Sequence, residues 1–260
     1  MTKTPSMRLF AALAVFSLLG AAAVWADPPS QVGRLSLISG AVSFHPGSLD
    51  EWAPATLNYP LSEGDHLWTD NGARAEVQLL TAAIRLNSVT EFSFLALDDQ
   101  TVQVRLTEGS VNVDLRSVDE GTTFEVDTPN AAVALPVAGS YRIDVTAGGE
   151  TSVTARSGTA QVLTGGDSFD VPGGQAAVVS GTDSVAYYVT GAPAPDEWDA
   201  WCDARDQRAV SVSSNPYVSR EMIGADDLND NGSWIVAAGY GPAWVPSRVP
   251  AGWAPYRYGH

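Results

Sequence analysis

The chain has 260 residues, with 30 acidic against 14 basic side chains and a formal net charge of −16. Such a surface repels phosphate backbones and anionic headgroups, so the composition argues against nucleic acid and anionic membranes as partners. Cys202 is the single cysteine, which excludes an intramolecular disulfide. The stability of the fold therefore has to come from its apolar core.

Residues 1–26 have the pattern of an export signal. Lys3 and Arg8 form a charged start, and an apolar run follows from Leu9 to Trp25. This run is short for a helix that spans a bilayer, and Ala26 before Asp27 suits a signal peptidase. An uncleaved membrane anchor is the alternative. We expect cleavage, export to the periplasm or the extracellular space, and no membrane insertion afterwards.

Residues 32–190 contain many short strands. Apolar and polar residues alternate over a few positions at a time, and Gly, Asn, Asp and Pro separate these segments. This pattern predicts an all-β domain, built either as a two-sheet sandwich or as a short β-solenoid. The strands are expected at 34–38, 41–45, 75–80, 82–86, 91–97, 101–107, 110–115, 123–127, 131–135, 140–146, 152–155, 159–163, 168–171, 176–179 and 185–189.

A glycine interrupts the clearest alternating stretch, which runs from Val104 to Leu115. We expect the chain to turn at Gly109, so that the two sides form a hairpin. A weaker echo follows 49 residues later, with Gly158 in the place of Gly109. The echo suggests stacked repeat units, although ordinary hairpin chemistry also accounts for it.

Several short segments of this region follow one another in a specific order. They are Ser39–Val42, Leu61–Asp65 leading to Thr69, Arg74–Leu79, Leu106–Val113, Phe124–Val133 and Gly173–Val179. In this order they resemble the FecR domain, a β-rich extracytoplasmic module named for a regulator of iron-citrate transport. The resemblance covers roughly residues 33–180 and implies a part in a signal relay.

Two departures from that family argue against direct control of a sigma factor, which the resemblance would otherwise imply. Val137–Ser140 stands where the family usually has an Arg-Gly-Thr turn. The family's regulators also carry a cytoplasmic segment and a membrane span ahead of the domain, whereas an export signal precedes it in this sequence. Direct control of a cytoplasmic sigma factor is therefore not expected.

A Pro/Ala-rich linker at 191–195 leads into a predicted helix from Asp196 to Ala209. Asp196 can cap this helix, and arginines suit its last turn. One face carries Trp198, Trp201, Cys202 and Arg205 at helical spacing. We expect this face to dock on the β domain with Cys202 half-buried, and a partner-binding face is the alternative.

The rest of residues 196–260 is an aromatic appendage rich in Trp, Tyr, Gly and Pro. Its end, Trp253–His260, resembles an uncharacterised module of exported bacterial proteins in which further repeats follow, so we expect a truncated appendage. The rings either pack on one another or stack on sugar faces. The candidates for ligand binding are Trp244, Trp253, Tyr256 and Tyr258.

Other motifs argue for no chemistry. Asp227–Gly232 matches half a calcium loop, but Ala238 stands where the loop needs a bidentate Glu, so a turn rich in Asp and Asn is expected. His45, His66 and His260 are isolated, and pairs such as Asp98–Asp99 and Asp226–Asp227 are expected to be solvated. No nucleophile elbow, phosphate loop or dinucleotide motif occurs. We therefore expect no metal, no cofactor and no enzymatic activity.

The sequence thus predicts a non-catalytic, exported binding or scaffolding protein of the cell envelope. Its partner is expected to be a neutral glycan or another envelope protein. The alternative is an extracytoplasmic component of a FecR-type signal-relay system. The sequence gives no indication of the oligomeric state.

Overall fold

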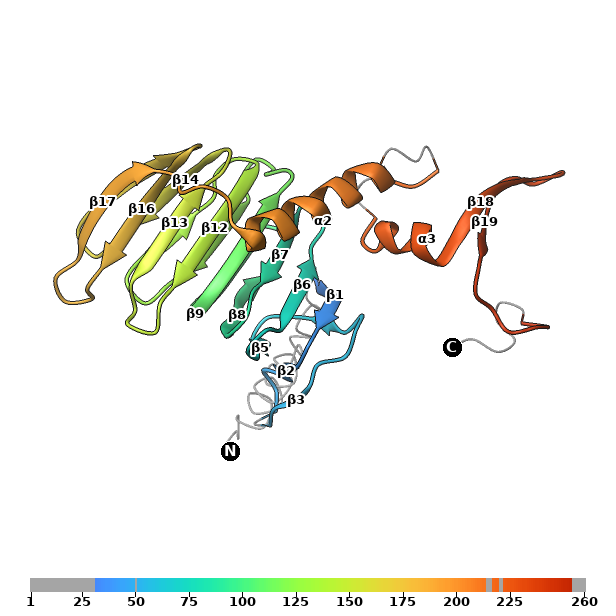
Figure 1. The fold of residues 1–260 in the computed structure, drawn as a ribbon, viewed down its shortest axis with the longest axis horizontal. Coiled ribbons are helices and arrows are strands. Elements are labelled where there is room, and N and C mark those ends of the chain that lie inside the picture. Colours follow the sequence, from blue (N-terminus) through green and yellow to red (C-terminus); the bar gives the residue numbers. More distant parts are fainter. Residues whose placement is uncertain (1–30, 50, 214–216, 220–221, 254–260) are drawn as a thin grey trace, which may run out of the picture.

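The computed structural model describes residues 31–49, 51–213, 217–219 and 222–253. Strands dominate, as the alternation predicts, and stand side by side along the long axis of the molecule (Figure 1). The first nine are β1 (Gly33–Ser39), β2 (Val42–His45), β3 (Ala53–Pro54), β4 (Pro60–Leu61), β5 (His66–Thr69), β6 (Arg74–Gln78), β7 (Ala82–Leu86), β8 (Thr90–Leu97) and β9 (Thr101–Leu115). The next eight are β10 (Thr123–Asp127), β11 (Ala132–Ala134), β12 (Gly139–Val145), β13 (Thr151–Ala155), β14 (Thr159–Leu163), β15 (Ser168–Pro172), β16 (Gln175–Ser180) and β17 (Ala186–Gly191).

These strands form two layers. Layer A has the order β4-β1-β6-β7-β9-β12-β13-β16-β17. Layer B has the order β3-β2-β5-β8-β9-β10-β11-β14-β15. Within these two orders every pairing is antiparallel except β9–β10. The all-β prediction is confirmed, and antiparallel layers make the domain a sandwich rather than a parallel solenoid.

Strand β9 belongs to both layers. Its first half pairs with β8 and β10 in layer B, and its second half pairs with β7 and β12 in layer A. Gly109 lies at the crossing with φ +98°, and a Cβ there would come within 2.4 Å of the Val89 carbonyl oxygen. The hairpin expected at this glycine is therefore wrong: the strand continues and changes layer.

The core fills the space between the two layers. Alternate residues of most strands point inward, and the largest fully buried side chains include Tyr141, Phe92, Phe94 and Leu35. The hydroxyl of the buried Tyr141 donates a hydrogen bond to the Val137 carbonyl at 2.7 Å, so this polar group is satisfied inside the core. This contiguous core explains how the domain is held without a disulfide.

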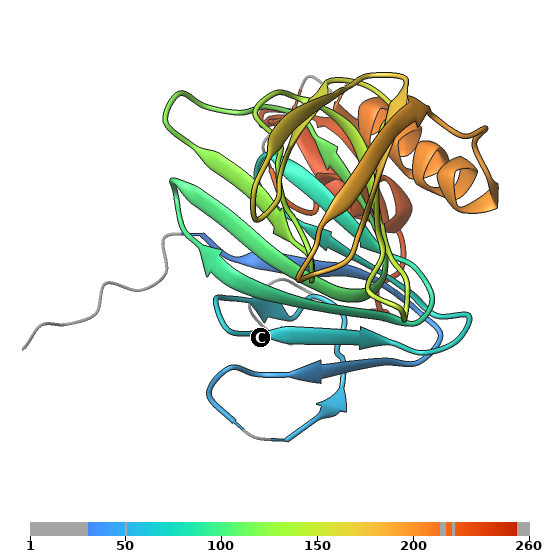
Figure 2. The same ribbon diagram turned by 90° about the vertical axis from the view of Figure 1, so that its left-hand side faces the viewer.

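Helix α2 (Glu197–Ser213) lies on the outer side of layer A (Figures 1 and 2). It starts where the sequence predicts and runs one turn further, so its arginines are not in the last turn. Trp198 is 3% exposed and Cys202 is 1% exposed. The predicted docking face is confirmed, and Cys202 is fully buried rather than half-buried.

Helix α3 (Ala225–Asn231) and a hairpin of β18 (Gly232–Ala237) and β19 (Gly241–Pro246) follow. The expected turn at 227–232 is wrong, because most of this segment is helical. Asp226 is buried and accepts hydrogen bonds from Gln78, so the expectation of a solvated acid is wrong for this residue. Asp227 forms an ion pair with Arg34 and stays 40% exposed. None of the described helices is long and apolar enough to cross a membrane.

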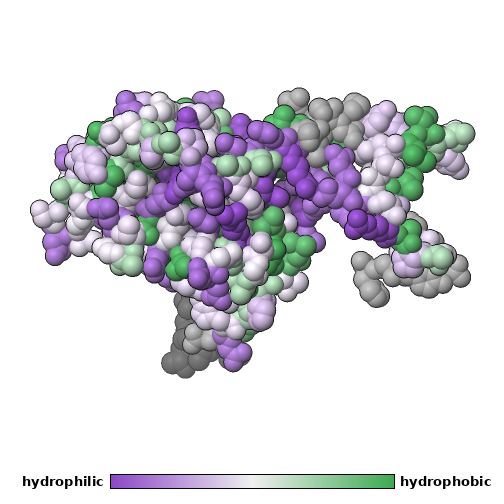
Figure 3. Space-filling view, viewed as in Figure 1, coloured by the Kyte–Doolittle hydropathy of each residue, from purple (hydrophilic) through white to green (hydrophobic). Residues whose placement is uncertain are grey.

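The surface around the helices differs in hydropathy from that of the β18–β19 hairpin. Hydrophilic side chains gather over α2 and α3, whereas hydrophobic ones gather on the β18–β19 hairpin at the far end (Figure 3). On that hairpin, Val236 is 81% exposed and Tyr240, in its turn, is 91% exposed. The appendage therefore packs few of its apolar side chains against the β domain.

Candidate functional site

A hollow of about 340 Å³ opens on the outer face of layer B. Ser43, Trp68 and Glu91 lie side by side on neighbouring strands β2, β5 and β8, and their side chains line it. The fourth lining residue is Trp52, which precedes β3 and is 50% exposed. Two indole rings thus border a space that also holds a hydroxyl and a carboxylate.

The two tryptophans are held differently. The Trp68 indole N–H donates a hydrogen bond to Asp70 at 2.7 Å, which fixes the ring on the sheet. Trp52 packs instead against two histidines, with ring centroids 5.3 Å from His45 and 6.4 Å from His66. The hollow therefore has one ring fixed by a hydrogen bond and a second ring supported by a histidine pair.

His45 and His66 are cross-strand partners of β2 and β5, with ring centroids 5.3 Å apart. The expectation that the histidines stay isolated is wrong for this pair, because the strand register brings them together, while His260 lies outside the described residues. Burial lowers the pKa of His66 and the charge of His45 lowers it further, while Glu91 and Asp65 act in the opposite direction. His66 is therefore held in its neutral form near pH 7.

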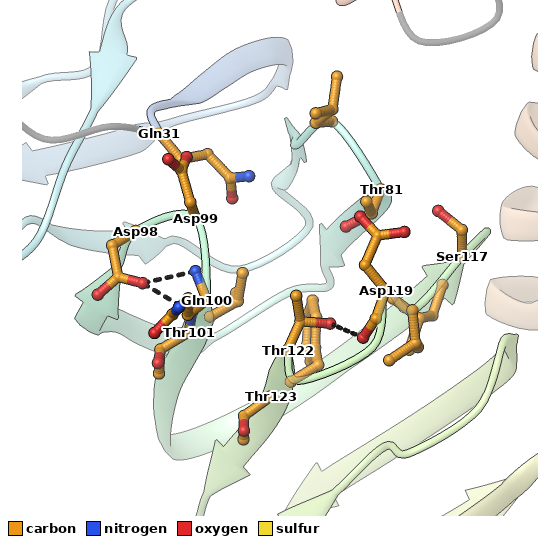
Figure 4. A pocket seen from close by; sticks show the side chains of 15 residues that line it. Gln31, Thr81, Asp98, Asp99, Gln100, Thr101, Ser117, Asp119, Thr122 and Thr123 are labelled. Atoms are coloured by element: carbon orange, nitrogen blue, oxygen red, sulfur yellow. Dashed lines mark hydrogen bonds between the residues drawn. The ribbon is translucent and has the colours of Figure 1, made fainter.

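A second hollow, of about 240 Å³, lies at one end of the sandwich (Figure 4). The β8–β9 turn and the segment before β10 form its rim, where Asp98, Asp99 and Asp119 lie. The Asp98 carboxylate accepts hydrogen bonds from the backbone N–H groups of Gln100 and Thr101 at 2.7 and 2.8 Å. This acid stabilises its own turn, as expected of Asp in this context.

A network of charged side chains joins α2 to layer A. Arg85, from β7, is 2% exposed and donates hydrogen bonds to Glu76 and to Asp206 of the helix. Arg205 of the helix donates two more to Glu76, at 2.6 and 2.7 Å. Burial alone would raise the pKa of Glu76, but Arg205 and Arg85 outweigh it and hold this pKa at about 2.

Two further ionisable groups near this interface have pKa values that burial raises. Burial and the neighbouring charge of Asp206 raise the pKa of Asp114 to about 6. Burial raises the pKa of the Cys202 thiol to about 12, which makes it a poor nucleophile.

At the start of the helix, Asp199 accepts hydrogen bonds from Arg142 and Arg156 at 3.1 and 2.7 Å. These charges fix the position of α2.

The predicted ligand-binding residues of the appendage are partly placed. Trp244 lies opposite Trp234 in the β18–β19 hairpin, and its indole N–H donates to the Leu228 carbonyl at 3.1 Å. Trp253 is half-buried in a turn after the hairpin. Tyr256 and Tyr258 lie outside the described residues. The binding role of these four residues stays a prediction.

Sequence reasoning missed the hollow lined by Trp52 and Trp68. The available signal was a tryptophan at a polar position of an alternating strand, since Leu67 and Thr69 on either side of Trp68 are buried. Trp52 gave no such signal, because it lies in a loop whose path depends on the fold.

Residues 65–161 match the family described as FecR protein, which confirms the resemblance found in the sequence. The matched segment begins just before β5 and ends within β14, so it includes Trp68, Glu91 and the crossing strand β9. No curated protein matches the chain.

Two crystal structures from Parabacteroides distasonis, each of a protein provisionally assigned as an anti-sigma factor, are similar to the chain. The first, at 1.65 Å resolution, is 19% identical with a TM-score of 0.46 and covers 53% of this chain. The second, at 2.50 Å, is 15% identical with a TM-score of 0.46 and covers 70% of this chain. The chain spans 64% of the first protein's length and 99% of the second's.

Proposed function

We propose that this protein is the extracytoplasmic component of a FecR-type signal-relay system and acts by binding another protein. The observation that carries the proposal is the FecR match over residues 65–161. This match favours the relay alternative over the scaffolding role that the sequence predicted first. Export to the periplasm or the extracellular space is part of the proposal.

The arrangement of charges supports binding rather than catalysis. Strongly shifted pKa values often mark catalytic groups. Here, however, the shifted carboxyls of Glu76 and Asp114 lie beneath α2, next to the arginine network that holds the helix. Their environment is thus accounted for by helix docking.

A relay component needs a surface for its partner, and strand β17 offers one. All six of its residues are exposed and uncharged, and among the described strands it pairs only with β16. An unpaired strand edge without charge can accept an extended strand of a partner. Tyr187 stacks on Phe169 with ring centroids 3.9 Å apart, which closes the core behind this edge. We therefore infer that the partner adds a strand at β17.

Transcript profiling of the native host tests the relay. Deletion of the gene is expected to change a restricted set of transcripts, and the wild-type chain is expected to restore them. The double variant Tyr188→Lys/Thr190→Lys, which charges the β17 edge, is expected to fold but not to restore them. Tyr240→Lys, at an even more exposed aromatic of the appendage, is the control and should restore them.

Two results would contradict the proposal. Unchanged transcripts after both deletion and overproduction, together with a weakened envelope, would support the scaffolding role instead. Full restoration by the β17 variant would show that the relay does not need this edge, and that the partner binds another surface of the domain.

A further inference from the structure

We propose that the hollow lined by Ser43, Trp52, Trp68 and Glu91 binds a neutral saccharide. The site is distinct from the β17 edge, since it lies on the outer face of layer B among the first strands of the domain. It is also distinct from the appendage residues Trp244 and Trp253. The proposal therefore does not depend on the relay.

The residue types match what a pyranose presents. A sugar ring has flat apolar faces bordered by hydroxyl groups, and an indole ring offers a large, rigid apolar surface for stacking. Trp52 is half exposed, and the Trp68 ring is fixed because its N–H is engaged by Asp70. The Glu91 carboxylate and the Ser43 hydroxyl can then form hydrogen bonds to sugar hydroxyls.

The size of the hollow suits a short piece of sugar chain. Pockets for small molecules occupy roughly 300–1,000 Å³, and this hollow of about 340 Å³ lies at the lower end. The hollow is bordered by strands that hold three of its four lining residues in register. A site built on neighbouring strands needs little rearrangement to bind, which lowers the entropic cost of binding.

The surrounding charges favour a neutral ligand. Glu91 lies opposite Glu108 across β8 and β9, and the whole chain has a net charge of −16, so an acidic saccharide would be repelled. On the side of Trp52, His45 and His66 border the site, and Arg105 lies across from Ser93 on the next strand pair. The positive charge of Arg105 disfavours a cation on that side.

Calorimetric titration of the full chain tests the site. The probes are neutral tetrasaccharides of glucose, mannose, galactose, xylose and N-acetylglucosamine, with tetralysine as a cationic probe. At least one tetrasaccharide is expected to bind, and Trp52→Ala is expected to weaken its affinity at least tenfold. Because Trp52 is half exposed, this variant should remain folded, as a circular dichroism spectrum would confirm. Glu91→Gln should weaken the binding several-fold.

Tyr240→Ala, at an exposed aromatic of the appendage outside the candidate binding residues, is the control and should leave the affinity unchanged. The proposal is overturned if no tetrasaccharide binds the folded protein, or if binding survives Trp52→Ala and is lost with Trp253→Ala. Tighter binding of tetralysine than of any sugar, abolished by Glu91→Gln, would identify a cationic peptide as the ligand and would also overturn it.

Discussion

Arg85 and Glu76 form an ion pair at 2.9 Å in which each side chain is only 2% exposed. The pair connects β7 to β6, and both partners also bind the helix, Arg85 through Asp206 and Glu76 through Arg205. Burial of charge is costly unless every charged group has a partner. The outer face of layer A and helix α2 therefore depend on each other.

Replacement of Arg85 by alanine is expected to destabilise the protein strongly. The change leaves the carboxylate of Asp206 without its guanidinium partner. Asp206 lies close enough to Asp114 for its charge to raise the pKa of Asp114, so the two acids would then repel each other without a cation between them. Breaking a buried ion pair from one side costs about 3–5 kcal/mol. Urea unfolding followed by tryptophan fluorescence would measure the loss. Arg248→Ala, at an exposed position of the appendage, should change the free energy of unfolding by less than about 0.5 kcal/mol.

Asp114→Asn is expected to stabilise the protein at neutral pH. A carboxyl whose pKa is raised to about 6 in the folded state, from an ordinary 3.8, favours folding at low pH and loses that contribution as the pH rises through 6. The neutral amide avoids this loss. The gain in unfolding free energy should be about 1–3 kcal/mol at pH 7 and absent below about pH 4.

Urea unfolding at both pH values would measure this gain, with the exposed Asp119→Asn as the control. An equal gain at pH 4 and pH 7 would show that the effect is not electrostatic.

Protonation of His66 should lower the stability of the domain. Its pKa in the fold lies below the ordinary 6.5, so the unfolded chain binds a proton first. Stability is fully present above pH 6.5 and falls as the pH drops below it. An NMR titration of the His66 ring should give a midpoint below 6.5, and His66→Gln should flatten the pH dependence. A midpoint at or above 6.5 would refute this assignment.

Labelling of Cys202 should report the docking of α2. The thiol is 1% exposed, and burial raises its pKa to about 12, so iodoacetamide is expected to react slowly with the native protein. Weakening the charged network with Arg85→Ala should accelerate labelling by at least tenfold, as mass spectrometry would measure. Equal rates in both proteins would mean that the helix does not separate from layer A in this variant.

Gly109→Ala is expected to cost more stability than Gly149→Ala. Both glycines have positive φ, at +98° and +78°, so both substitutions strain the backbone by about 1–2 kcal/mol. At Gly109 the new Cβ would also meet Val89 and Thr90 within 2.5 Å, whereas at Gly149 it meets nothing within 4 Å. A difference in melting temperature between the two variants isolates the close packing, and equal losses would contradict it.

Much of this fold could be predicted from alternation, because period-two patterns report burial directly. The strands around Val104, Phe124 and Ile143 follow from it, and the buried face of α2 follows from helical spacing. Helix α3 could not be predicted, because Asp and Asn disfavour helix interiors and only contacts such as Arg34–Asp227 fix the segment. The extension of α2 past Ala209 was missed because residues 210–213 are only Val and Ser, which have modest helix propensity.

The candidate site depended on pairings between distant segments. Trp68 and Glu91 are 23 positions apart, and only the β5–β8 register makes them neighbours. The same holds for His45 and His66, which look isolated in the sequence and are cross-strand partners. Chemistry that is assembled by strand register is invisible until the pairing is known.

The passage of β9 through both layers has a mechanical consequence. A sandwich whose sheets meet only through side chains can open by sliding one sheet over the other, with a small force spread over many weak contacts. Here the backbone of β9 runs continuously from layer B into layer A at Gly109. Sliding the layers would therefore have to break the backbone hydrogen bonds that β9 forms in each layer. A pull applied at β17 would therefore be carried as tension to the strands around Trp68, at the opposite end of the domain.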